Sequence, residues 1–226
     1  MGELYLVSTP IGNRQDITLR ALSVLTNLDY LLCEDTRKTK QLLNFYNLSH
    51  LPELISFYEE NEQIRQTQVV GWLKEGKKIG LVSNAGTPLI SDPGYKLVRE
   101  CIKEKIPVNN LPGANAILAS LVVSGLPPDK FMFLGFLPKK ERKKSQLLEN
   151  VKVILERLPQ TVIIYESPYR VVKTLLLIKT IMHKAQIVVC RELTKKFETI
   201  YRGEAEKVLK QLGDKKLKGE VVILFH

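Results

Sequence analysis

Strands and helices are predicted to alternate along the first half of this sequence, and that alternation limits the fold more than any other feature. A helix is predicted between each pair of neighbouring strands, and a helix is the usual connection between parallel strands. The alternation therefore predicts a mostly parallel sheet covered by helices. The β-rich stretches that define it lie at residues 3–8, 29–33, 54–57, 77–83 and 107–111.

The second half of the sequence predicts a mixed sheet with helices. A proline-containing break, Leu126–Asp129, separates the helix expected at 114–124 from the strands that follow. We therefore expect an α/β protein made of two α/β domains, residues 1–112 and 113–226, with the boundary somewhere within about 112–130. The later β-rich stretches lie at residues 131–137, 161–165, 186–190, 199–202 and 219–226.

Composition is that of a soluble globular chain, with 44% apolar and 26% charged residues. The apolar runs are too short to span a bilayer, and the N-terminus has no basic segment typical of a signal peptide, so we expect no membrane association. Three cysteines in a chain of 226 residues favour reduced thiols and a cytoplasmic location. The histidines and cysteines have no metal-ligand spacing, so no metal site is expected.

Charge is distributed unevenly. Residues 1–115 carry equal numbers of basic and acidic side chains, so the whole net charge of +10 arises in residues 116–226. Within that half, Pro138–Lys144 holds five basic residues in seven. Such a surplus favours a polyanionic partner such as RNA, although a solvated lysine-rich surface would give the same composition.

Three turns rich in glycine and proline follow predicted strands directly: Thr9–Asn13, Asn84–Pro88 and Leu111–Asn115. The carboxyl ends of parallel strands are where α/β sheets bind ligands, so together these turns predict a site lined by backbone groups. Turn geometry alone would also explain each of them. The dinucleotide and P-loop fingerprints are absent from the sequence.

Charged residues also follow the second predicted strand, in Cys33–Thr39. One interpretation is a helix N-terminus with acidic residues placed against the dipole. The other is that Glu34 or Asp35 orients a substrate hydroxyl while Arg37 and Lys38 hold phosphate. Asp16 is expected to cap the first helix.

Several short motifs occur along the whole chain. They are Ser8–Asn13 with Asp16-Ile17 and Arg20–Leu22, Cys33–Thr39, Ser83–Gly94, Leu111–Gly113, Gly135–Pro138, Tyr165–Pro168, Arg191–Lys195 and Lys218–Glu220. In this order they resemble the bacterial 16S rRNA 2'-O-ribose cytidine methyltransferase I family, which has the tetrapyrrole-methylase fold. The resemblance covers essentially the whole chain, although Asn84 stands where the family usually has an acidic residue.

The resemblance implies a dimeric enzyme that binds S-adenosylmethionine in a cleft between its two domains. It implies transfer of a methyl group to the ribose 2'-hydroxyl of one cytidine in the decoding region of 16S rRNA, with the rRNA or the small ribosomal subunit as partner. By motif matching, the cofactor would contact Pro10, Ala85, Gly86, Thr87, Pro88, Ile90, Pro112, Gly113, Ala114, Asn115, Tyr165 and Glu166.

In-line displacement on a methyl group needs alignment and removal of a hydroxyl proton. Glu34, Asp35 and Asp16 are the candidate catalytic residues. The candidate RNA-binding residues are Arg14, Arg37, Lys38, Lys139, Lys140, Arg142, Lys143 and Lys144. Two other functions remain open: a methyltransferase of the same fold acting on a tetrapyrrole or other small molecule, and a non-catalytic RNA-binding protein in ribosome assembly.

Overall fold

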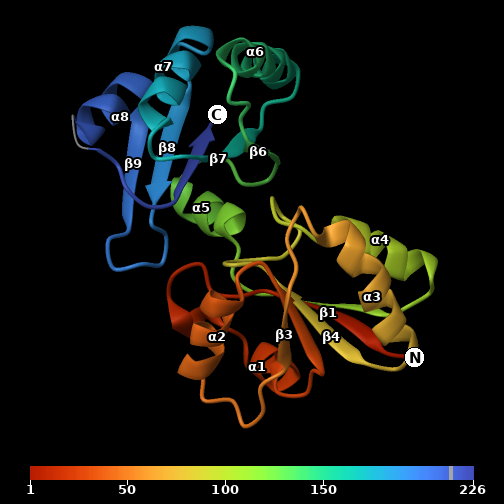
Figure 1. Cartoon of the computed structure of the whole chain (residues 1–226). Coiled ribbons are helices and arrows are strands. Elements are labelled where there is room, and N and C mark those ends of the chain that lie inside the picture. The colour runs from red at the N-terminus through yellow and green to blue at the C-terminus, as the bar shows by residue number, and fades with distance from the viewer. Residues whose placement is uncertain (214–215) are drawn as a thin grey trace. The chain divides into compact units, whose positions relative to one another are not determined.

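Each half of the chain builds its own five-stranded sheet (Figure 1). The computed structural model describes residues 1–213 and 216–226, and these divide into two units, Met1–Asn115 and Ala116–His226. The first unit contains β1 (Glu3–Val7), η1 (Arg14–Asp16), α1 (Leu19–Leu25), β2 (Tyr30–Cys33), α2 (Thr36–Phe45), β3 (Glu53–Ser56), α3 (Glu62–Lys74), β4 (Lys78–Val82), α4 (Tyr95–Lys103) and β5 (Val108–Leu111).

The sheet of the first unit has the order β3-β2-β4-β1-β5, and every neighbouring pair is parallel. This confirms the parallel sheet predicted from the alternation of strands and helices. Successive residues of a strand face opposite sides of the sheet, so Leu31 and Leu32 of β2 belong to different cores. Leu32 packs with residues of α3 and α4, whereas Leu31 packs with residues of α1 and α2.

Side-chain caps set the starts of α1 and α2 in the first unit. The Asp35 carboxylate accepts the backbone N–H groups of Arg37 and Lys38, so α2 begins directly after Asp35. The expected cap of the first helix was wrong by two residues. The Thr18 hydroxyl, not Asp16, accepts the Ala21 N–H at 3.0 Å, and α1 begins at Leu19.

The second unit contains α5 (Ala116–Ser124), β6 (Phe131–Phe136), α6 (Glu141–Arg157), β7 (Thr161–Glu166), α7 (Val171–Ile181), β8 (Gln186–Arg191), β9 (Thr199–Glu204), α8 (Ala205–Leu212) and β10 (Val221–Phe225). Its sheet has the order β6-β7-β10-β8-β9. The β6–β7 pair is parallel and the other three pairs are antiparallel, which confirms a mixed sheet. All five residues of β10 are buried, as expected for its central position.

Helix α7 of the second unit begins later than we predicted from the position of Pro168. Pro168 was expected in the first turn of a helix, but α7 begins at Val171. The Glu166 carboxylate accepts the Ser167 N–H at 2.8 Å, and the Arg170 N–H donates to the Ser167 carbonyl at 2.8 Å. These bonds hold a turn between β7 and α7.

No helix within the described ranges is long and apolar enough to cross a membrane.

Candidate active site

The turns after β1, β4 and β5 are joined by hydrogen bonds. Thr9 and Gly86 exchange two backbone hydrogen bonds, of 2.9 and 3.0 Å, which tie the first turn to the second. The Thr87 hydroxyl donates to the Ala114 carbonyl at 3.3 Å and accepts from the Asn115 side-chain amide at 3.1 Å, which ties the second turn to the third. We call residues 8–12, 84–88 and 111–115 the turn cluster.

Two glycines let the turns of this cluster approach one another. Gly86 has a φ of +81°, in the left-handed region that favours glycine. A Cβ atom on Gly113 would lie only 2.9 Å from the Cβ of Ser8. The Ser8 hydroxyl in turn lies 3.3 Å from that of Thr87.

The structure thus brings together most of the residues that the sequence proposed for the cofactor. The members of that set within the turn cluster are Pro10, Ala85, Gly86, Thr87, Pro88, Pro112, Gly113, Ala114 and Asn115. Ile90 lies two residues beyond, with an exposed side chain. Tyr165 and Glu166 belong to β7 of the second unit.

A pair of carboxylates lies at the same edge of the first sheet, after β2 and β4. The Asn84 side-chain amide donates a 2.6 Å hydrogen bond to Glu34. Burial, and then the negative charge of Glu34, raises the pKa of Asp92 to about 6, and a hydrogen bond from Ser83 opposes that shift. Asp92 therefore changes protonation state close to neutral pH, which suits a residue that accepts a proton from a substrate.

The loop that carries Asp92 has an unusual backbone. Leu89 and Ser91 have φ values of 72° and 65°, although neither is glycine, and Gly94 has a φ of 125°. The buried Glu62 carboxylate accepts the Gly94 N–H at 3.1 Å and fixes the end of the loop. Strained loop backbones of this kind gather at functional sites. Sequence reasoning missed Asp92, although it lies inside the quoted motif Ser83–Gly94.

Asp35 does not have the free carboxylate that a proton acceptor needs. Besides capping α2, it forms an ion pair with Arg37 at 3.1 Å. The hydrogen bond from Arg37 is the largest cause that lowers the pKa of Asp35 to about 2. The structure therefore supports the capping interpretation of Asp35 and Arg37. Asp16 is exposed in η1, and no hydrogen bond or ion pair among the described residues joins its carboxylate to Glu34 or Asp92.

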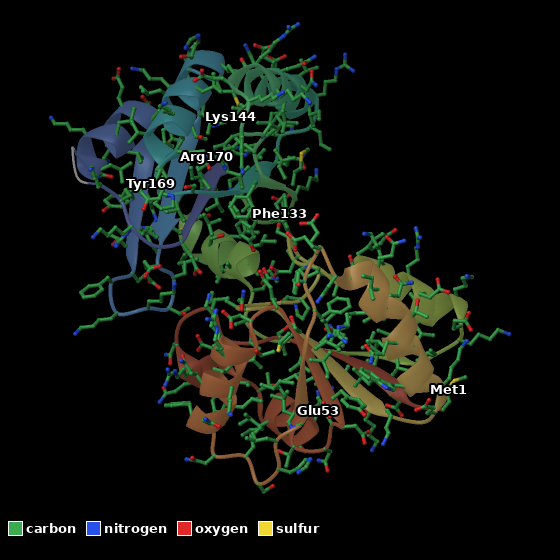
Figure 2. All side chains as sticks on the ribbon, viewed as in Figure 1. Met1, Glu53, Phe133, Lys144, Tyr169 and Arg170 are labelled. Carbon is green, nitrogen blue, oxygen red and sulfur yellow. The ribbon has the colours of Figure 1, made fainter. Side chains whose placement is uncertain are left out.

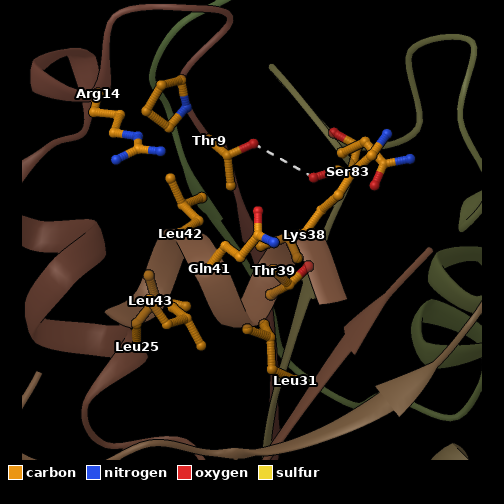
Figure 3. A pocket seen from close by; sticks show the side chains of 13 residues that line it. Thr9, Arg14, Leu25, Leu31, Lys38, Thr39, Gln41, Leu42, Leu43 and Ser83 are labelled. Carbon is orange, nitrogen blue, oxygen red and sulfur yellow. Dashed lines mark hydrogen bonds between the residues drawn. The ribbon is translucent and has the colours of Figure 1, made fainter. Parts of the chain in front are cut away.

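A cavity of about 140 Å³ opens beside the turn cluster (Figure 3). Its deeper part is apolar, and its other part carries hydroxyl, amide and cationic side chains. Arg14 and Lys38, both proposed to bind RNA, line it. The complete lining is Thr9, Pro10, Arg14, Leu25, Leu31, Lys38, Thr39, Gln41, Leu42, Leu43, Val82, Ser83 and Asn84.

Lys144 contradicts the expectation that it faces RNA. Its side chain is 7% exposed, and its ammonium group donates to the Thr174 hydroxyl at 3.2 Å and lies 4.0 Å from Glu166 (Figure 2). The other four basic residues of the run are exposed: Lys139, Lys140, Arg142 and Lys143. The proposed RNA-binding surface of this run is therefore reduced to those four.

Glu166 is a structural residue rather than a free side chain for a cofactor. One carboxylate oxygen accepts from Ser167 N–H and from Arg170 at 2.6 Å, and the other accepts the Thr174 hydroxyl at 2.7 Å. Its carboxylate is fully buried. The preceding residue, Tyr165, has the rings of Phe133 and Phe136 against it, at centroid distances of 4.9 and 5.5 Å.

The thiols and metal-ligating side chains offer no alternative chemistry. Burial raises the pKa of all three cysteine thiols, to about 11 for Cys101 and about 12 for Cys190, so they stay protonated and unreactive. Within residues 1–213 and 216–226, no group of three or more histidine, cysteine or acidic residues could hold a metal ion.

Known proteins resemble this chain over nearly its full length. Residues 3–209 match the model of the tetrapyrrole (corrin/porphyrin) methylases. A relative from Halalkalibacterium halodurans, named ribosomal RNA small subunit methyltransferase I, is 43% identical over 99% of this chain and 75% of its own. A relative from Thermotoga maritima with the same name is 41% identical over 99% of this chain and 98% of its own.

Solved structures show the same fold at much lower identity. The methyltransferase CobJ has a TM-score of 0.71 at 17% identity, over 100% of this chain and 94% of its own. Uroporphyrin-III C-methyl transferase from Thermus thermophilus, complexed with S-adenosyl homocysteine, has a TM-score of 0.66 at 17% identity, over 99% of this chain and 97% of its own. The family suggested by the motifs is therefore confirmed: the chain belongs to the tetrapyrrole methylases, in the branch whose curated members are named ribosomal RNA small subunit methyltransferase I.

Proposed function

We propose that this chain is an S-adenosylmethionine-dependent methyltransferase that methylates the ribose 2'-oxygen of a cytidine in the decoding region of 16S rRNA. The observation that carries the proposal is the meeting of two features at one sheet edge. The turn cluster lies after β1, β4 and β5, and the carboxylates of Glu34 and Asp92 lie after β2 and β4. The turn cluster suits binding of the cofactor, and the two carboxylates suit removal of a hydroxyl proton.

The residues of the turn cluster fit this cofactor. S-adenosylmethionine carries a sulfonium cation, and it supplies an electrophilic methyl group when bound. No arginine or lysine occurs in residues 8–12, 84–94 or 111–115, so no basic side chain of these turns would repel that cation. Backbone carbonyls of Ala85 and of residues 112–115 would hold it. The participation of Tyr165 remains a prediction from the family resemblance.

In this proposal, Asp92 takes the proton from the ribose 2'-hydroxyl. A carboxylate with a pKa of about 6 is largely ionised at neutral pH and is a stronger base than an ordinary aspartate. Glu34 helps to keep Asp92 basic through its negative charge, and Asn84 holds Glu34 in position. Glu34 and Asn84 are thus positioning residues, and Asp92 replaces Asp35 as the favoured proton acceptor.

The charge distribution supports an RNA substrate over a small molecule. The first unit has no net charge and the second carries the surplus of +10, with Lys139, Lys140, Arg142 and Lys143 exposed. A buried tetrapyrrole needs no such extended positive surface, whereas RNA phosphates are attracted by it. On the family resemblance, we further propose that the protein is a homodimer in the cytoplasm.

Methyl transfer from labelled cofactor tests the proposal. The substrates are small ribosomal subunits from cells that lack this protein and, separately, protein-free 16S rRNA. We expect label on one ribose 2'-oxygen in the decoding region. Absence of label from both, with intact binding of S-adenosylmethionine, would contradict the rRNA assignment and favour a small-molecule substrate. Absence of cofactor binding would favour a non-catalytic RNA-binding protein.

A further inference from the structure

The cavity beside the turn cluster has an apolar interior and a polar rim. Leu25, Leu31, Leu43 and Val82 are buried residues of the core beneath α2, and their side chains form its apolar wall. The rim carries hydroxyl and amide groups and two cations. In Figure 3 the Arg14 guanidinium and the Gln41 amide extend toward the same open region beside Thr9.

The size of this cavity is close to that of a single six-membered ring. Its volume is about 140 Å³. An apolar protein cavity of about 150 Å³ is known to hold one benzene molecule. A six-membered pyrimidine ring is close to this size, and the fused two-ring system of a purine is larger.

The rim offers hydrogen bonds to the edge of such a ring. Gln41 is exposed on α2, and in the described part of the chain its side-chain amide has no hydrogen-bond partner. A glutamine amide has two donor hydrogens and an acceptor oxygen, so it can pair with the donor and acceptor groups on the edge of a pyrimidine. The nearby hydroxyls of Thr9 and Ser83 donate to backbone carbonyls, so only their oxygens are left to accept a hydrogen bond.

The two cations at the rim are placed to receive phosphate. The Arg14 guanidinium lies 4.5 Å from the centroid of the Phe45 ring, which holds the side chain in place. Among residues 1–213 and 216–226, neither Arg14 nor Lys38 forms an ion pair with a carboxylate, in contrast to Arg37. Arg14 and Lys38 therefore keep their charge available for the phosphates on either side of a base.

We propose that this cavity receives the pyrimidine base of the nucleotide that is methylated, extruded from its RNA strand, with its flanking phosphates on Arg14 and Lys38. This inference rests on the proposed function. Asn84 connects the two sites, because it lines the cavity and also donates to Glu34. In this proposal the ribose of a base held in the cavity lies on the side of Asn84, and so toward Glu34. Enzymes that act on one nucleotide of a strand commonly take its base into a pocket in this way.

Filling the cavity is the first test. Leu42 lines the cavity and is half-buried, so Leu42→Phe places a ring inside it. The matched control is Leu48→Phe, since Leu48 is half-buried against the same core but does not line the cavity. We expect Leu42→Phe to raise the KM for the rRNA substrate about tenfold or more, with binding of S-adenosylmethionine and the Tm close to those of the control.

Removing the rim amide is the second test, and it does not disturb the core. Gln41→Ala is compared with Asn44→Ala, another exposed amide on α2 outside the cavity. The substrates are rRNAs with cytidine, uridine or adenosine at the methylated position. We expect the wild type and Asn44→Ala to prefer cytidine about tenfold or more over uridine and to reject adenosine, and Gln41→Ala to lose the preference between the pyrimidines.

The outcomes separate this inference from the function on which it rests. Wild-type methylation of 16S rRNA with an unchanged KM in Leu42→Phe would overturn the cavity assignment and leave the function intact. Equal methylation of adenosine and cytidine by the wild type would overturn it as well. A wild-type protein that binds S-adenosylmethionine but methylates no rRNA would overturn both.

Discussion

The side-chain amide of Asn84 donates a 2.6 Å hydrogen bond to the carboxylate of Glu34, and so ties the end of β4 to the end of β2. Glu34 in turn helps to raise the pKa of Asp92. The family resemblance led us to expect an acidic residue at the position of Asn84. Because an amide stands there in this chain, its carboxylate pair is Glu34 and Asp92, without a third negative charge at residue 84.

Ionisation of Asp92 is expected to destabilise the protein at neutral pH, relative to a variant without this carboxylate. The folded-state pKa of Asp92, about 6, exceeds the ordinary value of 3.8, so Asp92 binds more protons in the folded state between pH 4 and 6, and its own contribution to stability falls as the pH rises through that range. Asp92→Asn removes this penalty. We expect its free energy of unfolding to exceed that of the wild type by about 1–2 kcal/mol at pH 8 and to match it near pH 3, measured by urea denaturation. A lower stability at pH 8 would show that the Asp92 carboxylate is not destabilised by burial.

Close packing at Gly113 is expected to support cofactor binding. Gly113→Ala puts a methyl group within 2.9 Å of Ser8 Cβ and forces the turns after β1 and β5 apart. We expect the Kd for S-adenosylmethionine, measured by calorimetry, to rise about tenfold or more. The control is Gly71→Ala on α3, where a Cβ would meet nothing within 4 Å. That change should stabilise the protein by about 0.5–1 kcal/mol and leave the Kd unchanged.

The buried Glu166 is expected to be a stability residue. Glu166→Ala leaves Lys144 and Arg170 without their carboxylate partner in the interior of the second unit. We predict a loss of about 3–5 kcal/mol in the free energy of unfolding, measured by urea denaturation. Glu156→Ala, on the exposed part of α6, is the control and should change the free energy of unfolding by less than about 0.5 kcal/mol. Equal, small effects would mean that the buried network contributes nothing to stability.

The exposed basic residues before and at the start of α6 are expected to bind RNA phosphates. Replacement of Lys139, Lys140, Arg142 and Lys143 by alanine should weaken RNA binding and make it less dependent on salt. If all four contact phosphates of a single strand, the slope of log K against log salt becomes shallower by about 3. Filter binding across a salt series measures this slope. If the variant with all four alanines keeps the wild-type slope, the RNA binds elsewhere on the protein.

The sequence predicted the fold well because its strongest signals are local. The strand β4, predicted at 77–83, lies at Lys78–Val82, and α8 has the predicted bounds 205–212. Asp16 failed as a cap because Thr18 competes for the same helix end, and both residue types cap helices.

Lys144 shows that periodicity within a charged run carries information. The lysine belongs to a run of basic residues, which suggested a surface. Yet Leu148 and Val151 lie four and seven residues further along α6, and all three are buried on one face. Helical spacing alone therefore could have placed Lys144 on the apolar side of α6.

Asp92 could not be found from local patterns. The pKa of Asp92 is raised by its partial burial and by Glu34, which is far away in sequence. Only the parallel order of β2 and β4 brings the two residues to one edge of the sheet. The turn cluster, in contrast, was predictable, since each of its turns follows its own strand directly.

The pH dependence of a single methyl transfer tests the central claim most directly. Wild-type protein saturated with S-adenosylmethionine is mixed with excess small ribosomal subunits, and the rate of the first transfer is measured from pH 5 to 9. We predict a rate that rises with pH and levels off above a pKa near 6. Asp92→Asn should be slower by about 10²–10⁴-fold and lack this rise, while it still binds the cofactor. A wild-type rate in Asp92→Asn, or loss of the rise in Asp16→Asn instead, would contradict the assignment of Asp92 as the proton acceptor.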